Sequence, residues 1–190
     1  MRGQSVSEPA VDRRVRRSRT ALFAAAVRLV SERQTTAISL TELAEAADLS
    51  RQAAYSHFAD RDSLIVAAGM DLIERELFPQ LVDCEGGAWR DMAVLATTHL
   101  ARHREFYRAL GTGPCAYPTK QAVLSALAAP GPGGLLLPSL EGGDVATFIV
   151  GGCIAMFTRW LDEGGDLLDP DDMADRLLGV AGQFMLGSAN

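Results

Sequence analysis

The sequence predicts an all-α protein of about nine helices, with a small N-terminal domain and a larger helical C-terminal domain. Three observations lead to this prediction. Through most of the 190 residues, apolar side chains recur at three-and-four spacing, the period of a helix packed on a core. No segment alternates apolar and polar residues as a half-buried strand would. Glycine and proline gather at a few connecting positions: 111–118, 130–138, 142–143 and 164–170.

Three helices are expected in the N-terminal domain. Residues 20–32 place an apolar stripe on one face, from Leu22 to Val30. Ser39 and Glu42 have the spacing of a capping box, which opens a second helix. The segment 48–50 then makes a short break, after which Ser50 can cap a third helix that ends near residue 58.

The rest of the chain is expected to be helical as well. Asp60 can cap a fourth helix that runs from residue 61 toward Phe78, where Pro79 discourages continuation. Asp171 and Asp172 follow a proline and stand at the positive end of the last helix. The remaining helices are expected at 88–110, with a bend near His103, and at 119–129, 144–163 and 171–186.

Charge is distributed unevenly along the chain. The 18 basic and 24 acidic residues give a net charge of −6, which by itself argues against nucleic-acid binding. Residues 1–59, however, carry nine arginines and six acidic residues, or +3, whereas residues 60–190 carry −9. Five of the seven residues from Arg13 to Arg19 are arginine, whose guanidinium matches phosphate geometry. We expect residues 1–18 to form a flexible basic arm, which is also the usual state of a solvated tail.

Cysteine usage and hydropathy set the expected compartment. Cys84, Cys115 and Cys153 are odd in number and widely spaced, so neither a disulfide framework nor a structural zinc site is expected. The N-terminus has no apolar signal core. The longest apolar stretch, 145–157, is shorter than the ~20 residues of a membrane span. The expected location is the cytoplasm, away from any membrane.

Three short helices with a tight turn between the second and third are the ingredients of a helix-turn-helix. From Thr20 to Leu64, and above all in ISLTELAEAADLSRQAAYSHFADRDSL, the chain resembles the N-terminal DNA-binding domain of TetR-family (TetR/AcrR-like) transcriptional regulators. The shared features are the capped Leu-Ala helix, the Leu-Ser entry to the third helix, its Tyr-x-His-Phe exit, and a basic residue three positions after Phe58. Asp48 and Gln34 stand where the family usually has glycine, and Asp tolerates left-handed backbone better than Gln.

The resemblance implies a domain division and a set of DNA contacts. Residues 19–63 would be the helix-turn-helix domain and residues 64–190 the ligand-binding and dimerisation domain. Arg51 can pair with guanine and Gln52 with adenine. For Ala53 and Ser56 a merely structural role is equally open. The full predicted DNA-binding set is Ser39, Thr41, Ser50, Arg51, Gln52, Ala53, Tyr55, Ser56, His57 and Arg61.

The last two helices resemble the family helices that pair with their symmetry mates in a four-helix bundle. Small residues in 144–161 would let two helices approach closely, and the predicted dimer contacts are Ile149, Gly152, Ala155 and Met156. The alternative is that these helices bury their faces within one subunit. A helix that is apolar nearly all round favours contact on two sides, and hence a homodimer.

A largely apolar small-molecule effector is expected between the middle helices. The predicted pocket residues are Met92, Leu95, His99, Phe106, Tyr107, Tyr117, Phe148 and Trp160, although core packing is the commoner role for each. His99 and His103 have a spacing that can hold a metal, but no third ligand accompanies them in sequence and Arg102 and Arg104 add positive charge. No cofactor or metal is therefore expected.

The resemblance implies a homodimeric, ligand-responsive, sequence-specific regulator of transcription, most often a repressor, which a small molecule releases from a palindromic operator on double-stranded DNA. An enzyme is not expected, since the histidine pair is the only candidate for catalytic chemistry. A protein-interaction module that has lost DNA binding stays open as an alternative. Tyr55, His57 and Arg61 occur together in the family order, which speaks against it.

Overall fold

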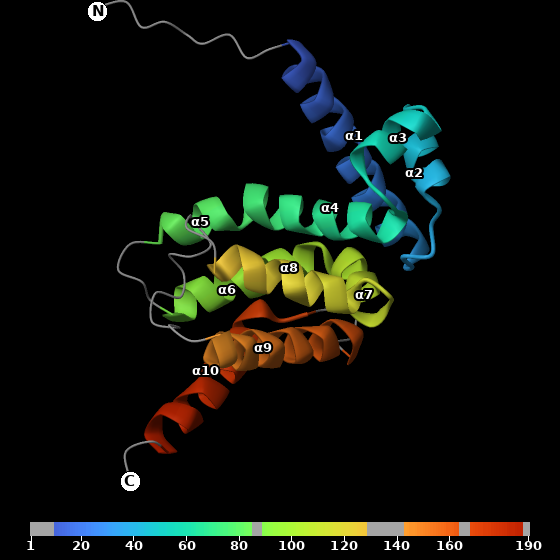
Figure 1. Ribbon diagram of the computed structural model, residues 1–190. Helices are drawn as coiled ribbons and strands as arrows, with labels where there is room; N and C mark the ends of the chain where they lie inside the picture. Colours follow the sequence, from blue (N-terminus) through green and yellow to red (C-terminus); the bar gives the residue numbers. More distant parts are fainter. Residues whose placement is uncertain (1–9, 85–88, 129–142, 164–167, 188–190) are drawn as a thin grey trace, which may run out of the picture.

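The computed structural model describes residues 10–84, 89–128, 143–163 and 168–187, and within these residues it is helical without any strand (Figure 1). The all-α prediction is confirmed. None of the helices in these ranges is long and apolar enough to cross a membrane. Counting the five-residue α5 separately, the helices are α1 (Ala10–Arg33), α2 (Leu40–Ala46), α3 (Arg51–His57), α4 (Arg61–Glu76), α5 (Phe78–Val82), α6 (Trp89–Arg102), α7 (Arg104–Thr112), α8 (Ala116–Ala128), α9 (Gly143–Glu163) and α10 (Pro170–Gly187).

Helices α1–α3, which we call the head, pack around a small apolar core. Its buried side chains include Leu22, Leu43, Ala54 and Phe58. The predicted capping box opens α2: the Glu42 amide donates to Ser39 Oγ at 3.2 Å, and the Ser39 amide donates to the Glu42 carboxylate at 2.9 Å. The Ala53 amide donates to Ser50 Oγ at 3.1 Å at the start of α3. Because α2 and α3 have seven residues each, caps worth ~1 kcal/mol apiece matter to them.

The two positions where glycine was expected both adopt left-handed backbone. Gln34, after α1, has φ 51°, and Asp48, between α2 and α3, has φ 54°. L-residues reach this region at a cost, which is smaller for Asp than for Gln. The turn geometry of the helix-turn-helix is therefore present without the glycines that usually provide it.

Helix α1 is longer than the sequence analysis predicted. It begins at Ala10, so residues 10–18 are helical and not a flexible arm, while residues 1–9 lie outside the described part of the chain. Neither glycine nor proline occurs between Ala10 and Arg33, and arginine is a good helix former. The Arg19 guanidinium also lies 4.9 Å from the ring centroid of Phe58 and 5.3 Å from that of Phe23, so this part of α1 packs against the core of the head.

Helix α4 connects the head to the body, which comprises α5–α10. Asp60 caps it as predicted, accepting from the Ser63 amide at 2.7 Å. In Figure 1, α4 passes between the head and the remaining helices. Gly69 permits close packing on α7, because a Cβ at this position would lie 3.1 Å from Leu110 Cδ2. The helix ends at Glu76, and Pro79 stands in the first turn of α5.

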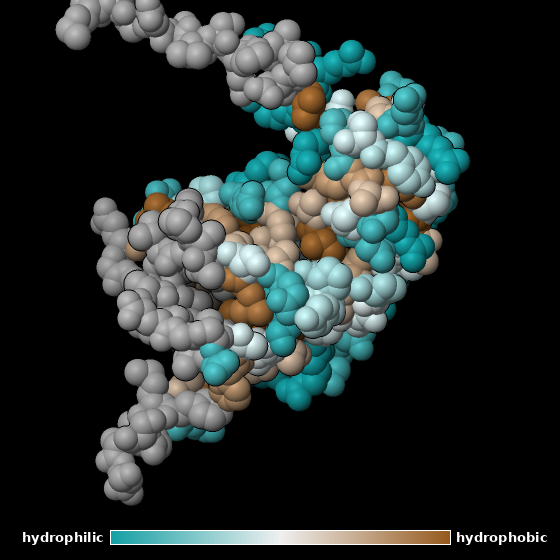
Figure 2. All heavy atoms as spheres, in the orientation of Figure 1, coloured by the Kyte–Doolittle hydropathy of each residue, from teal (hydrophilic) through white to brown (hydrophobic). Residues whose placement is uncertain are grey.

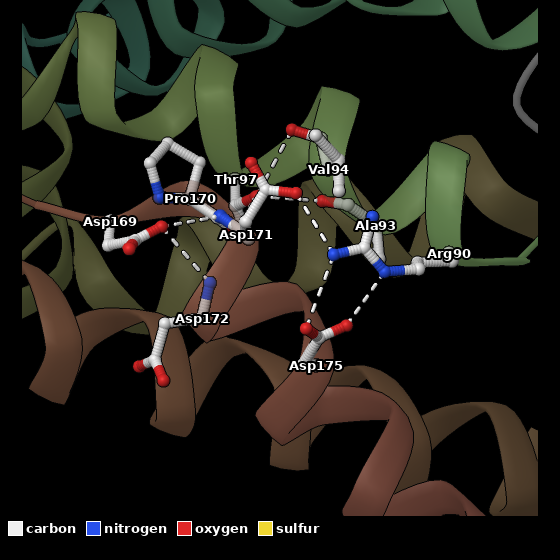
Figure 3. A network of polar contacts seen from close by, with 9 residues as sticks. All are labelled: Arg90, Ala93, Val94, Thr97, Asp169, Pro170, Asp171, Asp172 and Asp175. Atoms are coloured by element: carbon white, nitrogen blue, oxygen red, sulfur yellow. Dashed lines mark hydrogen bonds and ion pairs between the residues drawn. The ribbon is translucent and has the colours of Figure 1, made fainter.

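In the body, His103 lies between α6 and α7, at the place where the sequence predicted a bend. Figure 3 shows how α6 is joined to α10: Arg90 Nε donates to Asp175 at 2.8 Å, and its Nη2 donates to Asp171 at 3.0 Å. The buried Thr97 hydroxyl donates to the Pro170 carbonyl at 2.8 Å. These contacts hold the start of α10 against α6.

Candidate nucleic-acid interface

Helix α3 turns its polar side chains away from the core. Arg51, Gln52, Tyr55 and Ser56 are exposed, whereas Ala54 is completely buried. Ala53 and His57 are half-buried at the edges of the exposed face. In Figure 1, α2 and α3 lie side by side at the end of the molecule away from α9 and α10. An α-helix exposed in this way can enter the major groove of DNA.

Two interactions order the exposed face of α3. The Arg51 guanidinium lies 5.3 Å from the centroid of the Tyr55 ring, one turn along the helix. The Ser56 hydroxyl donates to the Ala53 carbonyl at 2.7 Å, so its proton is already used and its oxygen stays available as an acceptor. Ser56 is therefore a weaker candidate than Arg51 for donating to DNA.

The remaining residues of the predicted set stand at the starts of helices. Ser39 and Ser50 use their hydroxyl oxygens to cap α2 and α3, and Thr41 is half-buried in the first turn of α2. Arg61 is the first residue of α4, where its Nε donates to Asp62 at 3.1 Å. Helix N-termini attract phosphate through their free amides. These positions can thus contact the DNA backbone on either side of α3.

Exposed arginines line the N-terminal half of α1. Figure 2 shows a hollow between this segment and α4. An open groove of about 1020 Å³ lies here, between α1, α4 and α8. Arg16 and Arg19 line one side, while Asp60, Asp71 and Glu74 bring negative charge from the other. The mixed charge makes the groove itself a poor site for phosphate.

The predicted effector residues do not gather around one cavity. Phe106 and Trp160 are buried in the core, and Met92 and Leu95 are half-buried. Tyr117 is 71% exposed and Phe148 is 65% exposed, so neither ring is enclosed within the single chain. The reason is the orientation of α8 and α9, whose outer faces carry these two rings. Tyr117 borders an open groove between α8 and α9.

The structure adds one group that the sequence analysis did not identify. Glu76, at the end of α4, meets the histidine pair: its Oε2 lies 2.8 Å from His103 Nε2 and 3.9 Å from His99 Nδ1. The interpretation that the pair has no third ligand group is therefore wrong. No local pattern could have revealed Glu76, because it precedes His103 by 27 residues and belongs to another helix.

Burial governs the ionisation of this cluster. It lowers the pKa of His99 to about 4, with a smaller contribution from the charge of His103, so His99 is neutral at pH 7. Burial also opposes the ionisation of Glu76, but the hydrogen bond from His103 and the charges of His103, His99 and Arg75 together outweigh it, so the pKa of Glu76 lies below its usual 4.5. Tyr107, whose Oη lies 2.7 Å from His99 Nε2, has its pKa raised by burial.

Comparison with known protein families gives a match for most of the head. The sequence profile of "Bacterial regulatory proteins, tetR family" matches residues 22–68, which contain most of α1, all of α2 and α3, and the first half of α4. No curated protein matches the chain.

Solved structures show the same fold over nearly the whole chain. A TetR transcriptional regulator from Rhodococcus sp. RHA1 is 20% identical with a TM-score of 0.61, covering 86% of this chain and 96% of that one. NalD, the secondary repressor of the MexAB-OprM multidrug efflux pump in Pseudomonas aeruginosa, is 21% identical with a TM-score of 0.54, covering 89% and 96%. The multidrug binding protein EbrR, complexed with imidazole, is 20% identical with a TM-score of 0.52, covering 84% and 92%.

The match to the profile and the fold agree with the resemblance in sequence. Residues 22–68 match the model of the tetR family of bacterial regulatory proteins, and the chain has the fold of solved TetR-family regulators.

Proposed function

We propose that the protein is a homodimeric transcriptional regulator that binds a palindromic operator and responds to a small molecule, most simply as a repressor in the bacterial cytoplasm. One observation carries the proposal. Helix α3 presents Arg51, Gln52 and Tyr55 to solvent over a fully buried Ala54, within the segment that matches the tetR-family domain. This arrangement supports the proposal that α3 is a recognition helix.

The proposed division of labour follows from the chemistry of each side chain. Arg51 and Gln52, in the first turn of α3, would contact base edges, since arginine pairs with guanine and glutamine with adenine. Tyr55, His57 and Arg61 would contact phosphates and fix the register. The exposed arginines of α1 would add attraction that does not depend on sequence.

A homodimer would supply two such heads. Along α9, Ile149, Gly152 and Ala155 share one face at three-residue spacing and are all exposed in the single chain. A Cβ at Gly152 would meet nothing within 4 Å, so a second helix has room to approach there. An apolar face with small residues is suited to pair with its own copy about a two-fold axis. The two copies of α3 would then read the two halves of a palindrome.

Helix α4 would transmit the response. It begins directly after the recognition helix and ends among α6 and α7, so a shift of α4 moves the head relative to the body. A ligand changes the equilibrium only by binding one conformation better, and a tenfold preference is worth ~1.4 kcal/mol. Operator DNA must then weaken the binding of an inducer by the same factor. NalD, a repressor, and EbrR, a multidrug binding protein, have the same fold, which supports this kind of response.

The proposal is tested by footprinting the purified protein on the DNA that flanks its own gene, followed by gel shifts with a panel of apolar ligands. We expect a protected palindrome whose half-sites lie about one helical turn or a multiple apart. We also expect light scattering to give a dimer for the wild type and a monomer for Ala155→Glu. A protein that protects no site at low salt would contradict the proposal.

A further inference from the structure

Three groups that can ligate a metal converge where α4, α6 and α7 meet. The atoms concerned are Glu76 Oε2 from the end of α4, His99 Nδ1 from α6, and His103 Nε2 from the residue between α6 and α7. All three lie within 4.8 Å of one another. Bonds of 2.0–2.1 Å to a tetrahedral ion put ligand atoms roughly 3.4 Å apart. The Glu76 Oε2 distances of 2.8 Å and 3.9 Å to the two nitrogens bracket that value, so small side-chain rotations would close the site.

A second, independent observation points to a ligand at this place. The His99 side chain is only 2% exposed, and its Nδ1 has no hydrogen-bond partner among the residues that the structure describes. A buried polar atom without a partner is costly. The same nitrogen is directed toward Glu76 at 3.9 Å, too far for a hydrogen bond but suitable for a shared ion.

The other nitrogen of His99 is already held in place. Its Nε2 lies 2.7 Å from Tyr107 Oη, inside the core. Histidines that ligate a metal commonly hydrogen-bond through their second nitrogen, which fixes the ring and its tautomer. If Nε2–H donates to Tyr107, Nδ1 keeps a free lone pair that points at the cluster.

We propose that Glu76, His99 and His103 form a binding site for a divalent transition metal ion of the zinc type. Two imidazoles and one carboxylate suit Zn²⁺, Co²⁺ and Ni²⁺, whereas Mg²⁺ and Ca²⁺ take oxygen ligands. Three protein ligands leave a fourth position for water or another small ligand. Binding displaces the proton that joins Glu76 to His103, since both must offer lone pairs to the ion.

The position of the site gives it a regulatory meaning, which rests on the function proposed above. Glu76 is the last residue of α4, and α4 begins at Arg61, directly after the recognition helix and its connecting residues. An ion shared by Glu76 and the two histidines fixes the end of α4 to the joint between α6 and α7. The metal-bound and metal-free proteins then differ in how freely α4 can move the head.

The site is tested by titrating the chelator-treated full chain with Co²⁺, followed by visible absorption, and with Zn²⁺ in competition with a chromophoric chelator. We expect one ion per chain. Glu76→Gln and His103→Gln should each weaken binding at least tenfold, and both positions are partly exposed, so the variants should fold. Circular dichroism confirms that they do.

Two matched controls separate this site from adventitious binding. Glu74→Gln removes an exposed carboxylate from the same helix, and His57→Gln removes the only histidine outside the cluster. Both should bind Co²⁺ as the wild type does. The proposal is overturned if the wild type binds no ion, or if Glu76→Gln and His103→Gln bind it as tightly as the controls.

The proposed coupling between metal binding and operator affinity is measured separately. We expect Zn²⁺ to change the operator affinity of the wild type severalfold and to leave that of Glu76→Gln unchanged. Equal affinities with and without Zn²⁺ in a protein that binds the ion overturn the coupling. A protein that binds no DNA contradicts the proposed function, while the Co²⁺ titration still decides the metal site.

Discussion

The head and the body differ in where their polar side chains find partners. In the head, polar groups are exposed or bond to neighbours three residues away, as Ser39 does with Glu42 and Ser50 with Ala53. The body also has buried polar groups that bond across long stretches of chain: Thr97 donates to Pro170, 73 residues further on, and His99 lies near Glu76 of α4. A surface of local bonds is preformed for contact with a fixed partner. A buried polar cluster depends on the packing of several helices, so it is suited to sense their movement.

The largest effect should come from emptying the core of the head. Leu43→Ala deletes a completely buried side chain in a seven-residue helix and should lower the free energy of unfolding by about 2–5 kcal/mol. Met173→Ala, also completely buried but in α10, should cost a similar amount. Urea denaturation measures both losses. Only Leu43→Ala should also weaken operator binding well below its unfolding transition, and equal binding by the two variants would contradict a separate role for the head.

Removing the Arg51 side chain should have the next largest effect, and it should change only the affinity for the operator. Arg51→Ala takes away an exposed side chain that packs on the Tyr55 ring of the same helix, so the free energy of unfolding should hardly change. The loss of a pair with guanine should weaken operator binding by about 1–3 kcal/mol and relax specificity at one base pair in each half-site. Gel shifts against a set of single-base operator variants measure both.

A matched control for Arg51 lies in α4. Arg75 is also exposed and pairs with Asp71. Arg75→Ala removes the same charge from the chain away from α3 and should leave the pattern of base preference unchanged. If both variants lose affinity equally at every operator sequence, Arg51 contributes only charge.

The turn of the helix-turn-helix offers a change that stabilises. Asp48→Gly relieves a left-handed backbone at an exposed position and should raise the free energy of unfolding by up to about 1 kcal/mol. Gln34→Gly should raise the free energy of unfolding by less than the relief of its left-handed backbone alone would, because it also removes the hydrogen bond from Gln34 Nε2 to Glu105 at 2.6 Å. Thermal unfolding of the two variants gives the order. A destabilised Asp48→Gly would mean that the turn does not carry strain.

The same contrast explains what the sequence could predict. The caps at Ser39, Ser50 and Asp60 and the break at His103 depend on residues close together in the chain, and each was predicted correctly. The left-handed turns at positions 34 and 48 agree with the glycines that the resembling family usually has there. The third member of the histidine cluster was missed because it is set by the packing of α4 against α6 and α7. The outward rings of Tyr117 and Phe148 were missed for a similar reason, since periodicity does not say which of two apolar faces a neighbour covers.

The functional positions divide along the same line. Arg51, Gln52 and Tyr55 were chosen from the resemblance to TetR-family regulators together with the chemistry of their side chains, and the structure shows all three exposed on α3. The helical start of α1 was not foreseen, since a run of arginines is equally compatible with a solvated tail and with a helix. Whether these residues contact DNA stays a prediction for the variants above.

The smallest effect should come from the ion pairs that join α6 to α10 (Figure 3). Arg90→Gln removes contacts to Asp171 and Asp175, all of them on exposed side chains. Exposed ion pairs contribute little and are screened by salt. We expect a small fall in Tm that becomes smaller still at high ionic strength, in contrast to the cost of deleting a buried side chain such as Met173.

The pH dependence of the fall in Tm tests whether the loss of the ion pairs causes it. The hydrogen bond from Arg90 holds the pKa of Asp175 below its usual 3.8. A carboxyl whose pKa is lowered on folding stabilises the protein above its unfolded pKa, and this contribution is lost as the pH falls through the folded pKa. The Tm difference between the wild type and Arg90→Gln should therefore be full at pH 7 and should shrink on acidification below about pH 4. If the difference does not shrink as the pH falls below 4, the fall in Tm reflects the packing of the arginine stem on α10 and not its charge.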